Sequence, residues 1–265
     1  MDDKMDKVIL VVSFGTSYNN NRALTIGAIE KDIDEAFPDY EMRRAFTSQM
    51  VINILKKRDD LAIDNVGEAL ERALNDGVKT VVIQPTHIMN GTEYHFKIKD
   101  TVEKYLDKFE NIPIADPLLI TDEDFEDLIA SITSKGDYDD DTAVVFMGHG
   151  SPAESNMVYT KLQGMLKEKG FNNYYIGTVE AEPDYEDVLA MVKEKDYKKI
   201  VLKPLMVVAG DHATNDMAGD EEDSWKSVFA SEGYEVECVV EGLAQSKDIR
   251  DVYIKHAQKA IDSLE

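Results

Sequence analysis

Two histidines and one glutamate, His149, His212 and Glu93, are the residues of this sequence best suited to chemistry. A neutral imidazole can bind a metal ion or accept a proton, because its pKa is ordinarily ~6.5, and a carboxylate can balance the charge of a cation. Two imidazoles and one carboxylate suit a divalent transition metal such as Co, Ni, Fe or Zn, and are too rich in nitrogen for a dedicated Ca or Mg site. The three residues are far apart in the sequence, so their spacing alone makes no compact metal motif.

An internal repeat connects these residues. Two segments in the first half of the chain match two segments in the second half, in the same order. In the first match Phe14 aligns with His149, and in the second Glu93 aligns with His212. This pseudo-symmetry is an independent reason for Glu93 and His212 to face one site. The matched pairs are VILVVSFGTS (8–17) with AVVFMGHGSP (143–152), and KTVVIQPTHIMNGTE (79–93) with KIVLKPLMVVAGDH (199–212).

Strands and helices alternate in the same order in both halves. Apolar, β-branched segments are separated by amphipathic helical segments, which is typical of parallel sheets covered by helices on both faces. We therefore predict an α/β protein of two similar domains, residues 1–137 and 138–265, divided in the acidic segment KGDYDDD (135–141). Residues 8–116 and 143–240 should superpose. Ligands bind beyond the carboxyl ends of parallel strands, so we expect the three candidate residues to line a cleft between the domains.

The composition limits the class of protein. No window approaches ~20 uninterrupted apolar residues, and the charged N-terminus MDDKMDK does not have the layout of a secretory signal, so we expect a cytoplasmic protein without a membrane span. A formal charge of −24 argues against nucleic acid as a partner and attracts divalent cations. The lone Cys238 has no partner for an internal disulfide and is expected in the core. The sequence leaves the oligomeric state open, a homo-oligomer included.

The other three histidines are open to structural and functional interpretations. His87 lies at a strand end, where a packed core histidine and a site residue are both open interpretations. His95 is two residues past Glu93 and could face the cleft. His256 lies on the last predicted helix with polar neighbours, so a solvated helix face is the favoured interpretation; these neighbours are Lys255, Gln258 and Lys259.

Side chains near the predicted site could serve a substrate or only the fold. Phe14 offers a flat apolar surface at the mouth of the expected cleft. Arg43 and Arg44 end a strand at the same edge, where they could clamp carboxylates or form structural salt bridges. The acidic run that follows His212 (216–223) could guide cations to the site or form a solvated surface.

A competing motif is a dinucleotide fingerprint in the turn that contains His149. The segment GHGSPA (148–153) fits G-x-G-x-x-A between a strand and a helix. However, the acid that ends the next strand, Glu180, comes about thirty residues later instead of about twenty, and Pro152 stiffens the turn. The sequence also has no Walker A motif and no G-x-S-x-G elbow. We therefore expect neither a nucleotide nor a redox cofactor.

The motifs together resemble those of the anaerobic cobalt chelatases of cobalamin biosynthesis. That family inserts Co²⁺ into sirohydrochlorin, or into its precursor precorrin-2, without ATP. It belongs to the class II chelatases, which are related in fold to ferrochelatase and hold the tetrapyrrole between two similar α/β domains. The similar segments are LVVSFGTSY (10–18), RAFTS (44–48), HIMNGTEY (87–94), VVFMGHG (144–150) and PLMVVAGDHATNDMAGDEEDSWK (204–226).

The resemblance implies roles for individual residues. His149 and His212 would bind the metal, with His149 also the proton acceptor, and Glu93 would be the third metal-site residue and a catalytic group. The tetrapyrrole would contact a further set of residues near the first two motifs and the start of the third, namely Ser13, Phe14, Thr16, Arg44 and His87.

The chemistry of metallation agrees with this resemblance. The site must remove water from the metal, remove two pyrrole protons and bend the macrocycle, which imidazole and carboxylate groups can support without another cofactor. The substrate is rimmed by carboxylates and the protein is acidic, so local basic residues must offset the repulsion; Arg43 and Arg44 are candidates. Two alternatives stay open: a chelatase for Fe²⁺ or Ni²⁺, and a metal or tetrapyrrole carrier without catalysis.

Overall fold

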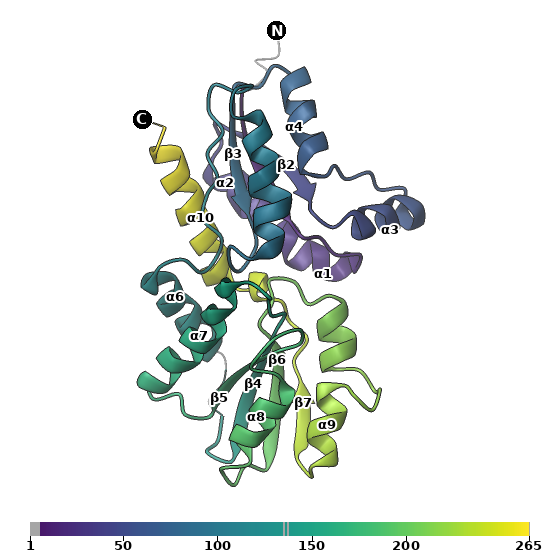
Figure 1. The fold of residues 1–265 in the computed structure, drawn as a ribbon, viewed down its shortest axis with the longest axis vertical. Helices are drawn as coiled ribbons and strands as arrows, with labels where there is room; N and C mark the ends of the chain where they lie inside the picture. Colours follow the sequence, from purple (N-terminus) through teal and green to yellow (C-terminus); the bar gives the residue numbers. More distant parts are fainter. Residues whose placement is uncertain (1–5, 135, 137, 265) are drawn as a thin grey trace. The chain divides into compact units, whose positions relative to one another are not determined.

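The computed structural model describes residues 6–134, 136 and 138–264 as two compact units, each an α/β assembly (Figure 1). The first unit contains residues 1–124 and 244–265, and the second contains residues 125–243. Among the described residues, no helix is long and apolar enough to cross a membrane.

The first unit is built on three parallel strands in the order β2-β1-β3. Residues Val8 to Ser13 of β1 are all buried, as expected for a strand covered on both faces. One face packs against α4 and α5, while α2 and α10 contact strands β2 and β3. Isolated bridges from Asn111 and Ile114 extend the sheet beyond β3, where the sequence predicts a short strand. The elements are β1 (Lys7–Ser13), α1 (Asn19–Leu24), α2 (Ile26–Ala36), β2 (Glu41–Phe46), α3 (Gln49–Asp59), α4 (Val66–Asn75), β3 (Thr80–Pro85), the π-helix η1 (Tyr94–Lys99), α5 (Asp100–Val102), the 3₁₀ turn η2 (Glu103–Tyr105) and α10 (Lys247–Asp262).

The second unit repeats this design with four parallel strands in the order β5-β4-β6-β7. Its core joins alternate residues of β4, such as Val145 and Met147, to Trp225 and Phe229 of α9. Helix α6 (Asp122–Thr133) begins in the first unit and ends in the second. The other elements are β4 (Thr142–Gly148), η3 (Glu154–Asn156), α7 (Met157–Glu168), β5 (Tyr174–Thr178), α8 (Tyr185–Val192), β6 (Lys199–Pro204), the π-helix η4 (Ala213–Met217), α9 (Trp225–Ser231), β7 (Glu235–Cys238) and η5 (Leu243–Gln245).

The predicted fold class and the repeat are confirmed down to the register of the strands. Val12 of β1 is the partner of Pro85 in β3, and the aligned residue Met147 of β4 is the partner of Pro204 in β6. The aligned glycines that follow β1 and β4 both have left-handed backbone conformations, with φ of 99° at Gly15 and 89° at Gly150. The two halves therefore use the same strand order and the same turn after their first strands.

The compact units divide the chain differently from the predicted ranges 1–137 and 138–265. Residue 137 itself lies outside the described part of the chain. The last helix, α10, belongs to the first unit, where Arg250 forms a 2.6 Å ion pair with Asp32 and the Tyr253 hydroxyl donates to the Thr86 carbonyl at 2.9 Å. Chain order predicts that this helix belongs to the second half, because it follows β7, whereas its apolar face covers the first sheet.

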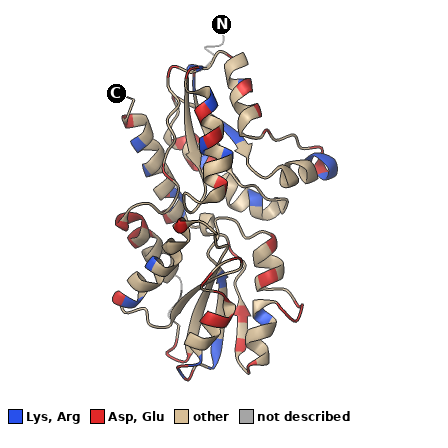
Figure 2. Ribbon diagram, in the orientation of Figure 1, with Lys and Arg blue, Asp and Glu red and all other residues tan. Residues whose placement is uncertain are grey.

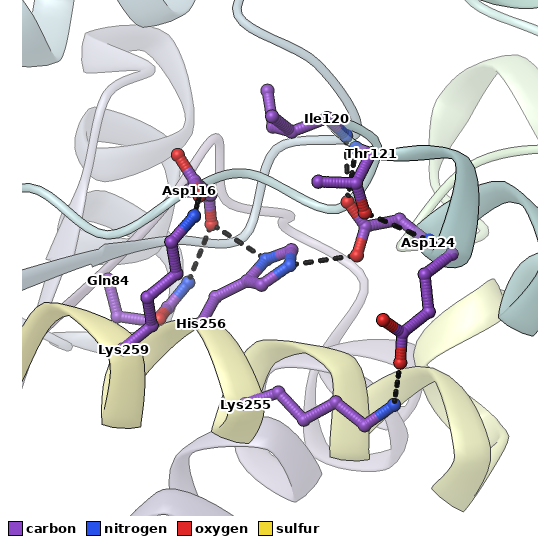
Figure 3. Close-up of polar contacts among 9 residues, drawn as sticks. Gln84, Asp116, Ile120, Thr121, Asp124, Lys255, His256 and Lys259 are labelled. Atoms are coloured by element: carbon purple, nitrogen blue, oxygen red, sulfur yellow. Dashed lines mark hydrogen bonds and ion pairs between the residues drawn. The ribbon is translucent and has the colours of Figure 1, made fainter.

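His256, on the same helix α10, also differs from its sequence prediction. Its expected position on a solvated helix face is wrong, because only 7% of the residue is exposed. Nδ1 lies 3.2 Å from the Asp116 carbonyl oxygen and Nε2 lies 2.9 Å from Asp124 Oδ1 (Figure 3). Asp124 also accepts hydrogen bonds from the backbone N–H groups of Ile120 and Thr121. This network holds α10 to the start of α6.

Candidate metal site

Three metal-ligating side chains come together in the second unit: His149, Glu180 and His212. One ligand atom from each lies within 4.8 Å of the others. Glu180 Oε1 is 3.8 Å from His149 Nε2 and 4.0 Å from His212 Nε2, and the two imidazole rings lie edge to face with centroids 4.8 Å apart. The residues follow the carboxyl ends of the neighbouring strands β4, β5 and β6, where parallel sheets bind ligands.

Two glycines create the turn that presents His149. A Cβ atom at Gly148 would lie 2.3 Å from the Tyr159 ring, so a larger residue would displace that ring. Gly150 has a φ of 89°, which L side chains rarely adopt, and its N–H donates to the Tyr159 hydroxyl at 3.3 Å. The imidazole between them is about half exposed, at 49% of its side-chain surface.

The loop that follows β5 brings Glu180 beside this turn. The backbone N–H of Glu180 donates to the His149 carbonyl at 2.9 Å, and the N–H of Val179 donates to the Gly148 carbonyl at 3.0 Å. These bonds continue the pairing of β4 with β5 past the ends of both strands. These main-chain contacts place the backbone of Glu180 next to that of His149.

His212 precedes η4, and its conformation is the counterpart of Glu93 before η1. The backbone angles are −58° and −43° at His212, and −61° and −44° at Glu93. The N–H of Thr214 donates to the Gly210 carbonyl at 3.0 Å, as the N–H of His95 does to the Gly91 carbonyl. The alignment of Glu93 with His212 is thus confirmed locally, and both stand before a π-helix, a feature often found at functional sites.

Hydrogen bonds determine which nitrogen of each ring can bind a metal. His149 Nδ1 lies 3.0 Å from the Gly150 carbonyl oxygen, and His212 Nδ1 lies 2.5 Å from Asp216 Oδ2. A carbonyl or carboxylate oxygen accepts, so Nδ1 carries the hydrogen in both rings. Each neutral imidazole then has its lone pair on Nε2, the atom that approaches Glu180.

The donor set fits a divalent transition metal. Metal–nitrogen and metal–oxygen bonds of about 2.0–2.2 Å place neighbouring ligand atoms roughly 3.0–3.5 Å apart. The distances of 3.8 and 4.0 Å to Glu180 Oε1, within a cluster that spans up to 4.8 Å, are wider, so side-chain rotations must draw the three residues together around a metal. Three protein donors leave the remaining coordination positions of the metal open to another ligand, as in catalytic metal sites.

The cluster includes Glu180, which the sequence analysis does not predict as a metal ligand. Asp216 lies outside the cluster and accepts a hydrogen bond from Nδ1 of His212. Glu93 belongs to the first unit, whereas the cluster lies wholly within the second. Its predicted part in the site therefore stays a prediction.

The residues around the first motif fall into buried and exposed groups. Ser13 and Thr16 are buried, at 2% and 4% exposure. The Ser13 hydroxyl accepts from Thr86 at 2.8 Å, and the Thr16 hydroxyl accepts from the N–H of Tyr18 at 3.2 Å. These hydroxyl groups shape the turn and are hydrogen-bonded within the protein. Phe14 is 51% exposed, in keeping with the predicted apolar surface.

Both arginines proposed as carboxylate clamps form salt bridges within the protein. Arg44 makes a bidentate pair with the buried Glu30. Arg43 contacts Glu41 and Asp76, each at 2.9 Å. Of the two interpretations that the sequence left open, the geometry favours the structural one.

His87 is partly buried as a residue, and its predicted contact with the substrate stays a prediction. Both ring nitrogens are buried and have no hydrogen-bond partner among the described residues. Burial lowers the pKa of His87 to about 4, so the ring is neutral at pH 7. The exposed His95 lies edge-on to the Tyr94 ring.

Two related proteins align with nearly the whole chain. A sirohydrochlorin cobaltochelatase of Salmonella typhimurium is 36% identical over 259 residues, which are 97% of each chain. The sirohydrochlorin cobaltochelatase CbiKC of Nitratidesulfovibrio vulgaris is 31% identical and covers 98% of this chain and 92% of its own.

Solved structures share the fold at low identity. The SirB protein of Bacillus subtilis with Fe³⁺ has a TM-score of 0.68 at 12% identity and covers 97% of both chains. A multi-domain protein of Deinococcus radiodurans, described as similar in structure to chelatases, has a TM-score of 0.62 at 10% identity and covers 96% of this chain and 55% of its own. The model of the cobalt chelatase family CbiK matches residues 7–262, and the chain belongs to that family.

Proposed function

We propose that this protein inserts Co²⁺ into sirohydrochlorin, with both the metal and the tetrapyrrole as substrates. The names of the two relatives and the family support this activity. The observation that carries it is the arrangement of His149, Glu180 and His212, in which one ligand atom of each residue lies within 4.8 Å of the others and the Nδ1 contacts leave both Nε2 atoms for a metal. Such a set can hold Co²⁺ while leaving positions open for the nitrogens of a macrocycle.

The two imidazoles are held differently, which suggests different roles. His212 donates to a carboxylate, whereas His149 donates to a main-chain carbonyl and is the more exposed of the two. A carboxylate partner raises the basicity of a metal-bound imidazole, so His212 is the firmer metal ligand in this proposal. His149 is the ligand that gives up the metal first.

One lone pair cannot hold a metal and a proton together, and this orders the steps at His149. As a pyrrole nitrogen forms its bond to Co²⁺, the bond from Co²⁺ to His149 Nε2 breaks. The freed Nε2 then accepts the proton that the pyrrole nitrogen loses. The second pyrrole proton passes to a carboxylate, and Glu93 is the proposed acceptor because the repeat makes it the counterpart of His212.

Metallation followed by absorbance tests this function. The purified protein is mixed with an excess of sirohydrochlorin, and Co²⁺, Fe²⁺ and Ni²⁺ are supplied in parallel. We expect many turnovers per protein with Co²⁺, and a much lower rate in His212→Ala at the same limiting Co²⁺ concentration. Metallation that stops at one equivalent would identify a carrier, and faster turnover with Fe²⁺ or Ni²⁺ would assign a different metal.

A further inference from the structure

Sirohydrochlorin is a flat macrocycle rimmed by carboxylates, and the protein that must bind it carries a formal charge of −24. Arg43 and Arg44, the expected clamps, already have carboxylate partners. Like charges repel a substrate over distances of about a Debye length, so binding requires a local positive charge that the protein's own acids do not neutralise.

We propose that Arg22 of α1 binds a carboxylate of the tetrapyrrole substrate, beside an exposed apolar surface that receives the macrocycle. The identity of this ligand rests on the function proposed above. The site lies at the carboxyl edge of β1, in the loop and helix that follow Ser13.

Three guanidinium groups gather around this loop. Arg22 Nη1 donates to the Thr16 carbonyl at 3.2 Å and to Asn19 Oδ1 at 2.8 Å. Arg58, in the last turn of α3, donates to the same Asn19 oxygen at 2.9 Å. Arg44 is the third, and its charge together with that of Arg58 acts on Arg22. Figure 2 shows blue segments on α1 and at the end of α3 in the first unit.

The carboxylates near these groups are occupied. Glu30 accepts hydrogen bonds from Arg44 through both of its carboxylate oxygens. Asp59 accepts from Arg58 through both oxygens and from the Asn19 amide at 3.1 Å. Three guanidinium groups thus face two carboxylates, and one positive charge is left over.

Arg22 carries that excess charge. Its side-chain hydrogen bonds among the described residues go to neutral oxygens and use one terminal nitrogen, which leaves the donors of Nε and Nη2 for the proposed ligand. Partial burial, and then repulsion from Arg44, lower the pKa of Arg22, although an arginine stays charged at neutral pH. A bidentate carboxylate would relieve this repulsion and match the planar fork of donors.

Large apolar side chains are exposed before and after Arg22 in the sequence and at the start of α3. Phe14 follows β1 and is 51% exposed, and its carbonyl accepts from the N–H of Ser48, the residue that caps α3. Leu24 ends α1 and is 57% exposed, while Met50 at the start of α3 is 66% exposed. Three exposed apolar side chains on the segments around the Arg22 loop, together with a guanidinium group whose hydrogen bonds among the described residues go to neutral oxygens, suit an amphipathic ligand with a flat apolar body and an anionic rim.

The test measures binding of metal-free sirohydrochlorin by absorbance or fluorescence titration. We expect Arg22→Gln to raise the dissociation constant about tenfold, because a charge-assisted hydrogen bond is lost, and Arg22→Lys to recover part of this loss. The steepness with which added salt weakens binding should fall in Arg22→Gln. Co²⁺ affinity measured without tetrapyrrole should stay at the parental value.

The matched control is Arg72→Gln. Arg72 is an exposed arginine of α4 that pairs with Asp64, so this variant has the same change of net charge in the same unit. It should bind sirohydrochlorin as the parent does.

Different results would overturn the proposed function and the proposed role of Arg22. A parent protein that does not bind or metallate sirohydrochlorin would overturn the proposed function. A parent that does so, together with an Arg22→Gln variant of equal affinity and equal salt dependence, would overturn the role of Arg22. Equal losses in Arg22→Gln and Arg72→Gln would show a general effect of charge, and would also overturn it.

Discussion

His212 Nδ1 and Asp216 Oδ2 lie 2.5 Å apart, across one turn of the helical segment that contains η4. The carboxylate therefore orients the imidazole and fixes its hydrogen on Nδ1, which leaves Nε2 for the metal. Chelation also requires that the metal be released, so one firmly oriented ligand and one weakly held ligand are a useful combination.

The first prediction concerns Asp216. Replacing it with Ala should weaken Co²⁺ binding about 10- to 100-fold, and Asn should cost less because its amide oxygen still accepts from Nδ1. The visible absorption of bound Co²⁺ measures both affinity and geometry. Asp220→Asn is the control, since Asp220 is 93% exposed at its side chain and pairs with Lys226. Parental affinity in Asp216→Ala would remove the orienting role.

The second prediction separates the two histidines. His212→Ala should raise the Co²⁺ dissociation constant strongly, and high metal concentrations should restore part of the rate. His149→Ala should lose turnover even at saturating Co²⁺, because no other lone pair accepts the pyrrole proton at that position. Steady-state rates over a range of Co²⁺ concentrations test this. Substantial turnover of His149→Ala at saturating metal would assign the proton to another group.

The third prediction separates Glu180 from Glu93. Glu180→Gln should weaken Co²⁺ binding, because a charged ligand in the cluster becomes neutral. If Glu93 accepts a proton, Glu93→Gln should lower kcat and leave Co²⁺ affinity close to that of the parent. Direct Co²⁺ titration and kcat together decide the roles, and the reverse pattern would exchange them.

The sequence predicted the symmetric parts of the site better than the asymmetric ones. Glu93 and His212 were aligned correctly because each follows a strand, a proline and a glycine at the same spacing. Glu180 lies outside the matched segments, and only its place at the end of the strand next to His149 could have identified it. Asp216 is four residues past His212, which is the spacing of one helical turn. Several other acidic residues lie nearby in the sequence, so this spacing alone does not single out Asp216.

The last helix shows why chain order is a weak guide to domains. The polar neighbours of His256 indicate exposure, but α10 is amphipathic, and its buried face is determined by the sheet it covers. The sequence pattern of α10 does not indicate which of the two sheets the helix covers. The buried partner of His256, Asp124, stands more than a hundred residues earlier in the sequence.

The fourth prediction concerns the turn that carries His149. Gly148→Ala places a Cβ atom 2.3 Å from the Tyr159 ring, so the free energy of unfolding should fall by about 1–3 kcal/mol. Co²⁺ affinity should fall as well, because Tyr159 accepts the hydrogen bond from Gly150. Gly164→Ala in α7 meets no atom within 4 Å and should stabilise the protein slightly. Chemical denaturation compares the two, and equal stabilities would contradict the steric argument.

The fifth prediction is a pH dependence of stability from Asp124. Burial by itself would raise the pKa of Asp124, but the backbone N–H groups of Thr121 and Ile120 and the imidazole of His256 outweigh it and hold this pKa below its ordinary value. A carboxyl group whose pKa is lower in the folded state stabilises the protein above its unfolded pKa of ~3.9, and this stabilisation is lost as the pH falls through the lower folded value.

Asp124→Asn should therefore lower the free energy of unfolding at pH 7 by about 2 kcal/mol, since a buried charge-assisted hydrogen bond to His256 is removed. The difference from the parent should begin to shrink as the pH falls below the unfolded value of ~3.9, and should disappear below the lower folded value, where the parental carboxyl group is neutral as well. Glu123→Gln is the control, because Glu123 is 75% exposed at its side chain and pairs with Lys255 at 3.5 Å, and such exposed pairs contribute little. Urea unfolding at several pH values measures all three proteins. A difference between Asp124→Asn and the parent that stays constant from pH 7 to the acid limit would mean that the charge of Asp124 does not stabilise the contact between α10 and α6.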